Sequence, residues 1–410
     1  MSGRPSRGFW PLRDLPVVFW LLAAVVVAVA HPVVPAPRWL LIHLVLLGAA
    51  THSIVVWSRH FADALLRTPI RPTARREQNL RLLMLNVGGA CVAVGVAAAH
   101  WFVTLAGAVA VVVAVGWHGV GLLAQLRAAL PARFAVTVRF HVAAAALLPV
   151  GVTIGVLLVK VQADPWHVRL LVAHASINLL GWIGLTALGT LVTLWPTMLR
   201  TRIAPGAEAA ARRGLPILLS GVVLAAGGAL ADVRLITVLG YLAYLAGLCV
   251  LARSFVAAAR SSTPDSYATY SVFAALCWLL GCLIALAGVV ITSGGWAHLD
   301  ARFTWFTPFL AAGFGVQLLL GALSYLIPVA LGGGPGPVRA ANDVLDRLAA
   351  TRVVAANGAL LVSALPVPAA VRVSCSVVVL AALASFLPLL ILAIRASLKV
   401  KRGGAVRSAD

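Results

Sequence analysis

The sequence predicts an all-α, polytopic membrane protein with about twelve transmembrane helices. Of its 410 residues, 62% are hydrophobic and only 10% are charged, and the mean hydropathy is +1.01. Soluble domains contain roughly 25% charged residues, so a soluble fold is excluded. Apolar runs such as 17–30 and 108–115 are uninterrupted, whereas the strands of outer-membrane barrels alternate apolar and polar residues. These runs therefore predict helices that cross the bilayer.

Twelve apolar stretches, separated by short Arg-bearing segments, approach the roughly 20 residues that a membrane span needs. The predicted spans are 16–31, 39–63, 80–100, 102–124, 137–159, 168–196, 214–231, 235–257, 269–293, 303–330, 353–369 and 373–396. The chain then consists of an N-terminal segment over 1–15, a transmembrane domain over 16–396 and a basic tail over 397–410. Connections are short, and the Gly/Pro-rich stretch 332–337 opens one of the longest, so no extramembrane domain is expected.

The distribution of basic residues predicts the orientation of the spans. If the N-terminus is cytoplasmic, 26 of the 32 Lys and Arg residues lie on the cytoplasmic side. The six on the other side are Arg38, Lys160, Arg169, Arg234, Arg302 and Arg372. The positive-inside rule then places both termini in the cytoplasm. The net charge of +21 is accordingly read as a topology signal rather than as a nucleic-acid-binding surface, and we expect a multi-pass protein of a bacterial cytoplasmic membrane, with the lipid bilayer as its main partner.

An internal repeat divides the spans into three four-helix units, over about 16–124, 137–257 and 269–396. In the sixth and tenth spans, a Gly, a second Gly eight positions later and a Pro fifteen positions after the first Gly recur in the same order. These residues are Gly181, Gly189 and Pro196 in the sixth span, and Gly313, Gly321 and Pro328 in the tenth. The separation from Gly48, in the second span, to Gly181 is nearly the same as that from Gly181 to Gly313, close to a third of the chain. The alternative is that Gly is simply common in membrane helices, where it allows close packing.

A second pattern agrees with the repeat. Arg81 precedes Asn86 by five positions, and Arg352 precedes Asn357 by the same five, each near the start of the span that follows the Gly-bearing one. A repeat of this length requires that the first span be retained rather than cleaved as a signal peptide.

Three four-helix units in twelve spans resemble the catalytic subunit of the haem–copper oxidases. The segments from Arg38 to His43 and from Arg169 to His174 each place an Arg at the outer edge and a His one to two turns inside it, which is similar to the start of the haem-ligand helix in that superfamily. The stretch from His174 to Pro196 also resembles the His-rich helices of oxidase-like membrane proteins, including the NnrS-type nitric-oxide-tolerance proteins. The resemblance implies haem b, with copper as a further cofactor, and a role in electron transfer or in nitric-oxide- or copper-linked respiration with a redox partner on the outer face.

The sequence also departs from the oxidase pattern. The oxidases need a second axial His on the tenth helix and an adjacent His-His pair for copper, whereas residues 304–328 contain no His and no His-His pair occurs in the chain. The resemblance therefore implies a divergent, non-oxidase member that lacks a complete binuclear centre.

His43 and His174 are the candidate axial ligands, because they lie at nearly matching depth in corresponding helices of adjacent units. Two such helices that face each other can supply one axial ligand each to a haem. The alternative is that each is a neutral His bonded to a helix carbonyl or to a neighbour such as Thr51, Ser176 or Asn178. For copper, the sequence offers His52 together with His118 or His141.

Two other classes of function stay open: a cofactor-free permease or facilitator, and a structural or assembly partner of a respiratory complex. None of the eleven acidic residues lies near the middle of a predicted span. Ion-coupled transporters usually need such a carboxylate, so ion coupling is disfavoured. No soluble-enzyme motif occurs either, and any chemistry must come from a cofactor held between helices.

Overall fold

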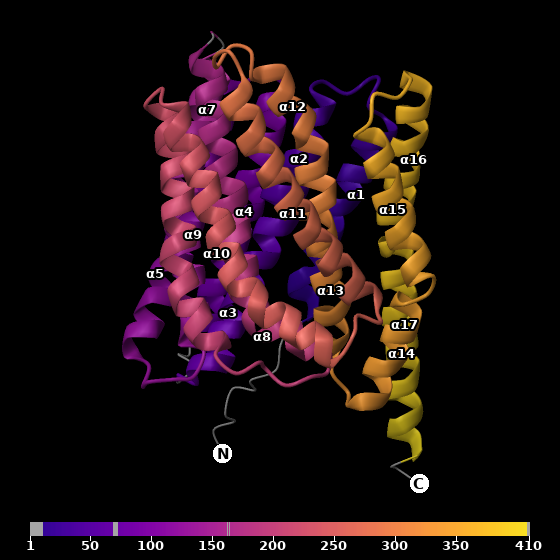
Figure 1. Cartoon of the computed structure of the whole chain (residues 1–410). Coiled ribbons are helices and arrows are strands. Elements are labelled where there is room, and N and C mark those ends of the chain that lie inside the picture. Colours follow the sequence, from indigo (N-terminus) through magenta and orange to yellow (C-terminus); the bar gives the residue numbers. More distant parts are fainter. Residues whose placement is uncertain (1–10, 69–72, 162, 164, 408–410) are drawn as a thin grey trace.

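The described part of the computed structural model, residues 11–68, 73–161, 163 and 165–407, consists of helices and short connections and contains no strand (Figure 1). Ten of its helices are long and apolar enough to cross a membrane. The predicted all-α class is confirmed, and the ten apolar helices agree with a polytopic membrane protein. Residues 1–10 of the predicted N-terminal segment and 408–410 of the predicted tail lie outside the described residues.

Short connections join successive helices. They are α1 (Leu15–Val29), α2 (Pro37–His43), α3 (Thr51–Leu66), α4 (Ala74–Ala97), α5 (Trp101–Ala128), α6 (Ala135–Lys160), α7 (Trp166–Ala175), α8 (Leu185–Met198), α9 (Ala207–Leu230), α10 (Arg234–Ser261), α11 (Tyr267–Thr292), α12 (Asp300–Pro308), α13 (Gln317–Leu331), α14 (Pro335–Leu345), α15 (Ala349–Ser363), α16 (Ala369–Ala384) and α17 (Phe386–Arg407). A 3₁₀ turn, Pro11–Asp14, leads into α1.

Three helix pairs are continuous, because a π-helical segment joins their two halves. The joining segments are Leu44–Ala50 between α2 and α3, Ser176–Gly184 between α7 and α8, and Phe309–Val316 between α12 and α13. A π-helix bonds each N–H to the carbonyl five residues back and often marks a functional site. The three composite helices, Pro37–Leu66, Trp166–Met198 and Asp300–Leu331, are the second, sixth and tenth predicted spans.

The composite helices form the centre of the molecule. In their most apolar stretches, 61%, 78% and 67% of the residues are buried, against 28–44% in the other long spans. The first composite helix touches both of the others. Trp182 donates its indole N–H to the Thr51 hydroxyl (3.0 Å), and Leu46 packs against Gly315. Side chains on these three helices can therefore meet in the interior.

Tight packing of a tryptophan on a glycine recurs at the first and third π-helical segments. The Trp20 indole lies against Gly48 and donates to Asn86 Oδ1 (2.7 Å). The Trp278 indole lies against Gly313 and donates to Asn357 Oδ1 (2.6 Å). Only glycine leaves room for an indole on the helix backbone, which explains why glycine stands at these positions.

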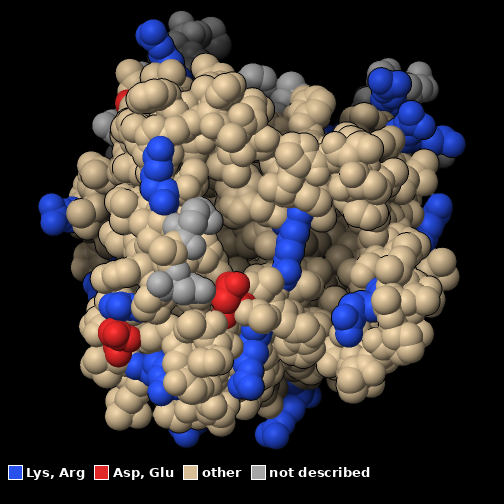
Figure 2. Space-filling model, turned by 90° about the horizontal axis from the view of Figure 1, so that it is seen from above, with Lys and Arg blue, Asp and Glu red and all other residues tan. Residues whose placement is uncertain are grey.

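The two ends of the bundle differ in charge. The connections after α3, α5, α8, α10 and α13 lie at one end, at the bottom of Figure 1. We call this the basic end, because most of the described Lys and Arg residues belong to these connections and the helix ends beside them. Figure 2 shows the opposite end, where Lys and Arg side chains are scattered singly around a hollow in the face.

Two stretches that were expected to be a connection between spans and a basic tail contain helix. The connection 332–352 contains α14, which begins at Pro335, where the fixed φ of proline suits a first helical residue. The expected basic tail continues α17 as far as Arg407. Near that end of the chain, the Lys401 ammonium donates to the Leu331 carbonyl (2.6 Å), which satisfies a carbonyl at the end of α13.

Candidate bis-histidine site

His43 is the last residue of α2, about 9 Å inside the end of the first composite helix at the face shown in Figure 2. Its Nδ1 lies 2.8 Å from the Trp39 carbonyl, and its ring stacks on the Trp39 indole with centroids 3.9 Å apart. A carbonyl can only accept a hydrogen bond, so Nδ1 carries the proton. The ring is thus held in one orientation, and its Nε2 has no hydrogen-bond partner among the described residues.

His174 lies on α7, about 12 Å inside the end of the second composite helix. Its Nδ1 is 2.9 Å from the Gly151 carbonyl of α6, which again requires a proton on Nδ1. The Asn178 amide nitrogen, 3.1 Å from the same Nδ1, donates instead to the His174 carbonyl (2.9 Å). A Cβ at Gly155 would lie 2.7 Å from His174 Cε1, so the ring rests directly on the α6 backbone.

The two imidazoles face each other across the first and second composite helices. Their ring centroids are 6.2 Å apart with an interplanar angle of 30°. Two imidazoles on opposite sides of one metal ion, each about 2 Å from it, have centroids roughly 6 Å apart. Metal-ligating histidines almost always donate their other ring N–H to a carbonyl or carboxylate. The pair therefore has the spacing and the tautomers that a bis-imidazole metal site needs.

The arginines that precede these histidines fasten the composite helices to their neighbours. Arg38 donates to the Thr304 carbonyl and the Thr307 hydroxyl of α12. Arg169 donates to the Ala229 carbonyl (2.9 Å) and to the Leu230 carbonyl at the end of α9. At the end of α9, the Arg169 cation satisfies unpaired carbonyls and the helix dipole. Each Arg therefore fixes the depth of the helix that carries the His five positions later.

His52 is occupied at both ring nitrogens. Its Nε2 donates to the Arg13 carbonyl (2.7 Å), and its Nδ1 accepts from the Asn86 amide (2.8 Å). The structure thus joins His52 to the Trp20–Asn86 pair rather than to His118 or His141. No lone pair of His52 is left for a metal in this arrangement.

His118 on α5 and His141 on α6 are both fully buried and each uses one ring nitrogen. The Nε2 of His118 bonds the Ser58 hydroxyl (2.8 Å), and the Nε2 of His141 bonds the Thr190 hydroxyl (3.0 Å). Their Nδ1 atoms are buried without a hydrogen-bond partner in the described chain. Among the described residues no group of three or more His, Cys, Asp or Glu side chains could hold a metal ion.

Sequence reasoning missed the groups that support the candidate ligands. Gly151 and Gly155 on α6 provide the surface on which His174 rests, and the spacing Gly-x-x-x-Gly was the available signal. Trp39 was overlooked as the ring that orients His43, although a spacing of four positions places both on one helix face.

No protein-family model matches the chain, and no curated protein matches it.

Proposed function

We propose that the chain is an integral membrane haem protein in which His43 and His174 are the two axial ligands. The observation that carries the proposal is the pair of imidazoles 6.2 Å apart, each with Nδ1 on a backbone carbonyl and Nε2 without a partner in the described residues. Haem supplies reversible one-electron transfer when it is bound. The protein fixes the tautomer of each imidazole, stacks the Trp39 indole on the His43 ring and packs the His174 ring against the α6 backbone.

The position of the pair favours electron transfer at the outer side of a bacterial cytoplasmic membrane. Both histidines lie near the end of the bundle that carries few basic residues, and the positive-inside rule assigns that end to the outside. A redox partner on that side would exchange electrons over a short distance. A role in nitric-oxide- or copper-linked respiration is part of the same proposal.

The finer architecture that we propose is twelve spans in three four-helix units with both termini inside. The two spans beyond the ten long helices are α1 and α15, of 15 residues each. Supporting the repeat, the three π-helical segments begin at Leu44, Ser176 and Phe309, so they are almost evenly spaced along the chain. The Trp–Asn pairs Trp20–Asn86 and Trp278–Asn357 recur at corresponding places in the first and third units.

A reduced-minus-oxidised visible spectrum of the full chain, purified from cells that supply haem, tests the function. We expect a haem α band in the unsubstituted protein and its loss or strong shift in His43→Ala and in His174→Ala. His167→Ala is the matched control, because His167 lies on the same helix and also places Nδ1 on a carbonyl, that of Val161 (2.8 Å). Size-exclusion profiles establish that the variants are folded.

Two outcomes would contradict the proposal. Haem that survives both substitutions in folded protein would place its ligands elsewhere. Protein that purifies without haem from competent cells would make the permease or facilitator the better assignment.

A further inference from the structure

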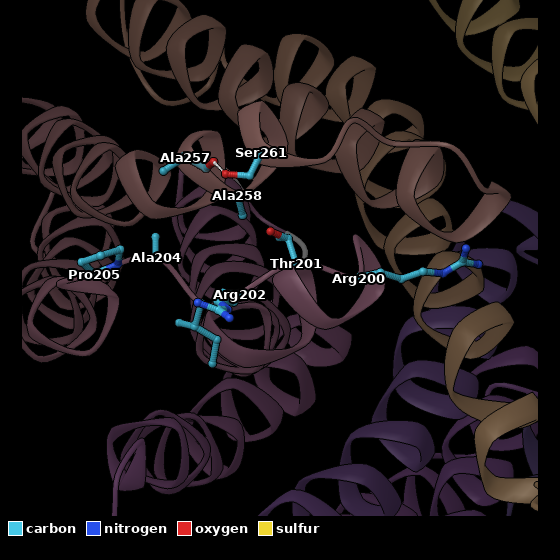
Figure 3. Close-up of a pocket in the computed structure, with 9 residues that line it drawn as sticks. Arg200, Thr201, Arg202, Ala204, Pro205, Ala257, Ala258 and Ser261 are labelled. Atoms are coloured by element: carbon cyan, nitrogen blue, oxygen red, sulfur yellow. Dashed lines mark hydrogen bonds between the residues drawn. The ribbon is translucent and has the colours of Figure 1, made fainter. Parts of the chain in front are cut away.

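A cavity of about 660 Å³ opens at the basic end, between the connection from α8 to α9 and the last turns of α10 (Figure 3). A second cavity of about 350 Å³ lies on the other side of the same connection, since Ala204 and Pro205 line both. Neither cavity is near the candidate haem site, because His43 and His174 lie toward the opposite end.

The larger cavity has donors for an anion that are not used within the protein. Arg202 is exposed and has neither an ion pair nor a hydrogen bond among the described residues. The Thr201 hydroxyl likewise has no partner there. The backbone N–H groups of Arg202, Ile203 and Ala204 donate to no backbone carbonyl in the described chain. A guanidinium with neighbouring amides and a hydroxyl is the donor set that binds phosphate oxygens.

The carboxylates around the cavities do not compete with an anion. Glu208 is the one acidic residue that lines either cavity, and it is paired with Arg212 at 2.6 Å. Arg133 lines the smaller cavity and adds a further positive charge. Arg200 points away from the other lining residues (Figure 3). Burial raises the pKa of the Asp346 carboxyl, and the Arg200 charge opposes this shift.

Apart from Ser261, the rest of the wall of the larger cavity is apolar and adjoins the lipid-facing surface. Ile203, Ala204, Pro205, Ala257, Ala258 and Ser261 complete the lining, and the Ser261 hydroxyl donates to the Ala257 carbonyl (3.1 Å). Val256, which precedes Ala257 on α10, is 46% exposed, as expected for a side chain that contacts acyl chains. A free inorganic phosphate would leave this apolar wall uncovered, whereas the glycerol and acyl groups of a lipid would cover it.

We propose that this cavity binds the phosphate group of an anionic phospholipid of the leaflet at the basic end. Arg202 and Thr201 hold the phosphate oxygens, and the apolar wall receives the glycerol backbone. Basic pockets between transmembrane helices are known to bind such headgroups. The site is independent of haem binding, so either proposal can fail without the other.

The test titrates the full chain in detergent with dioleoyl phosphatidylglycerol and follows the thermal unfolding midpoint. We expect Arg202→Gln to raise the half-saturating lipid concentration about tenfold, because a charge-assisted hydrogen bond to the phosphate is lost. Thr201→Val should weaken it less. Arg339→Gln is the matched control: Arg339 is an exposed arginine of α14 at the same end and away from the cavity. Arg339→Gln should change the half-saturating lipid concentration by less than about threefold, since salt screens distant exposed charges.

Three results would overturn the assignment. Equal stabilisation by dioleoyl phosphatidylcholine would show that the negative headgroup is not recognised. Saturation by inorganic phosphate at the same concentration would make the site one for a free anion. An unchanged titration in Arg202→Gln, with the midpoint without lipid preserved, would show that lipid binds elsewhere.

Discussion

At the scale of single residues, the structure separates histidines that are satisfied within the protein from those that have a free lone pair. His52 bonds at both nitrogens, whereas His43 and His174 each bond at Nδ1 only. The third composite helix offers a comparison for His52. Gln317 takes the place of His52 there, four positions after the π-helix glycine, and exchanges two hydrogen bonds with Asn357. His52 is therefore best explained as a partner for Asn86.

The comparison with Gln317 predicts the effect of substitutions at His52. His52→Gln should keep a hydrogen bond to Asn86 and cost less than about 1 kcal/mol. His52→Leu should cost about 1–3 kcal/mol, because the half-buried Asn86 amide loses one of its two acceptors and the Arg13 carbonyl loses its donor. Thermal unfolding of the two variants checks this. Equal destabilisation by Gln and Leu would show that hydrogen bonding to Asn86 is not the role of His52.

Asp14, in the turn before α1, predicts a pH dependence of stability. Burial raises the pKa of its carboxyl to about 7, although the Trp57 indole opposes the shift. A carboxyl whose folded-state pKa is raised stabilises the fold while it is protonated, so this contribution is complete below about pH 4 and is lost as the pH rises toward 7.

Replacing Asp14 by an uncharged residue of the same shape tests that dependence. Asp14→Asn should raise the free energy of unfolding at pH 8 by about 2–4 kcal/mol and flatten its change between pH 4 and 7. Unfolding midpoints measured across this range check it. A variant that is less stable than the unsubstituted protein at pH 8 would contradict the assignment.

At the scale of elements, the π-helical segments bring glycine backbones against aromatic rings. Gly313 faces the Trp278 indole, and a Cβ there would lie 2.7 Å from Cγ of that ring. The ring cannot retreat easily, because its N–H is bonded to Asn357 and its face is stacked on Phe309 at 5.4 Å. The segment is therefore sensitive to even one methyl group.

Gly313→Ala should lower the free energy of unfolding by about 1–3 kcal/mol through overpacking. The control is Gly281→Ala in α11, where no atom lies within 4 Å of the added Cβ. That change should be neutral or stabilising by up to about 1 kcal/mol, since alanine favours helix. Thermal unfolding of both variants distinguishes them. A neutral Gly313→Ala would show that Trp278 can move aside.

At the scale of the whole molecule, the asymmetry of charge between the two ends predicts the orientation in the membrane. The basic end holds the connections after α3, α5, α8, α10 and α13, together with the end of α17. Loops rich in Lys and Arg are retained in the cytoplasm. The candidate haem site and the proposed lipid site then lie near opposite faces of the membrane.

Reporter fusions test this orientation. A reporter joined after Asp410 should indicate a cytoplasmic terminus, and one inserted near Gly294, between α11 and α12, should indicate an outer loop. Alkaline phosphatase and a fluorescent protein give complementary signals. The reverse pattern would move His43 and His174 to the cytoplasmic side and contradict a redox partner on the outer face.

The sequence by itself determined the helical membrane class and the charge difference between the ends, because both depend on local composition. It also located the glycines of the three composite helices, since Gly48, Gly181 and Gly313 recur at a nearly constant spacing. It did not predict the π-helical turns, which depend on how neighbouring helices pack around each glycine.

Only the tertiary structure decided which histidines meet. His43 and His174 lie on different composite helices and far apart in the sequence, and the 6.2 Å separation of their ring centroids depends on how these two helices pack. The role of His52 depends on the Arg13 carbonyl, a backbone group that no side-chain pattern reveals. Composition and period act along the chain, whereas ligation and hydrogen bonding between helices act through space, so only the packed structure brings these partners together.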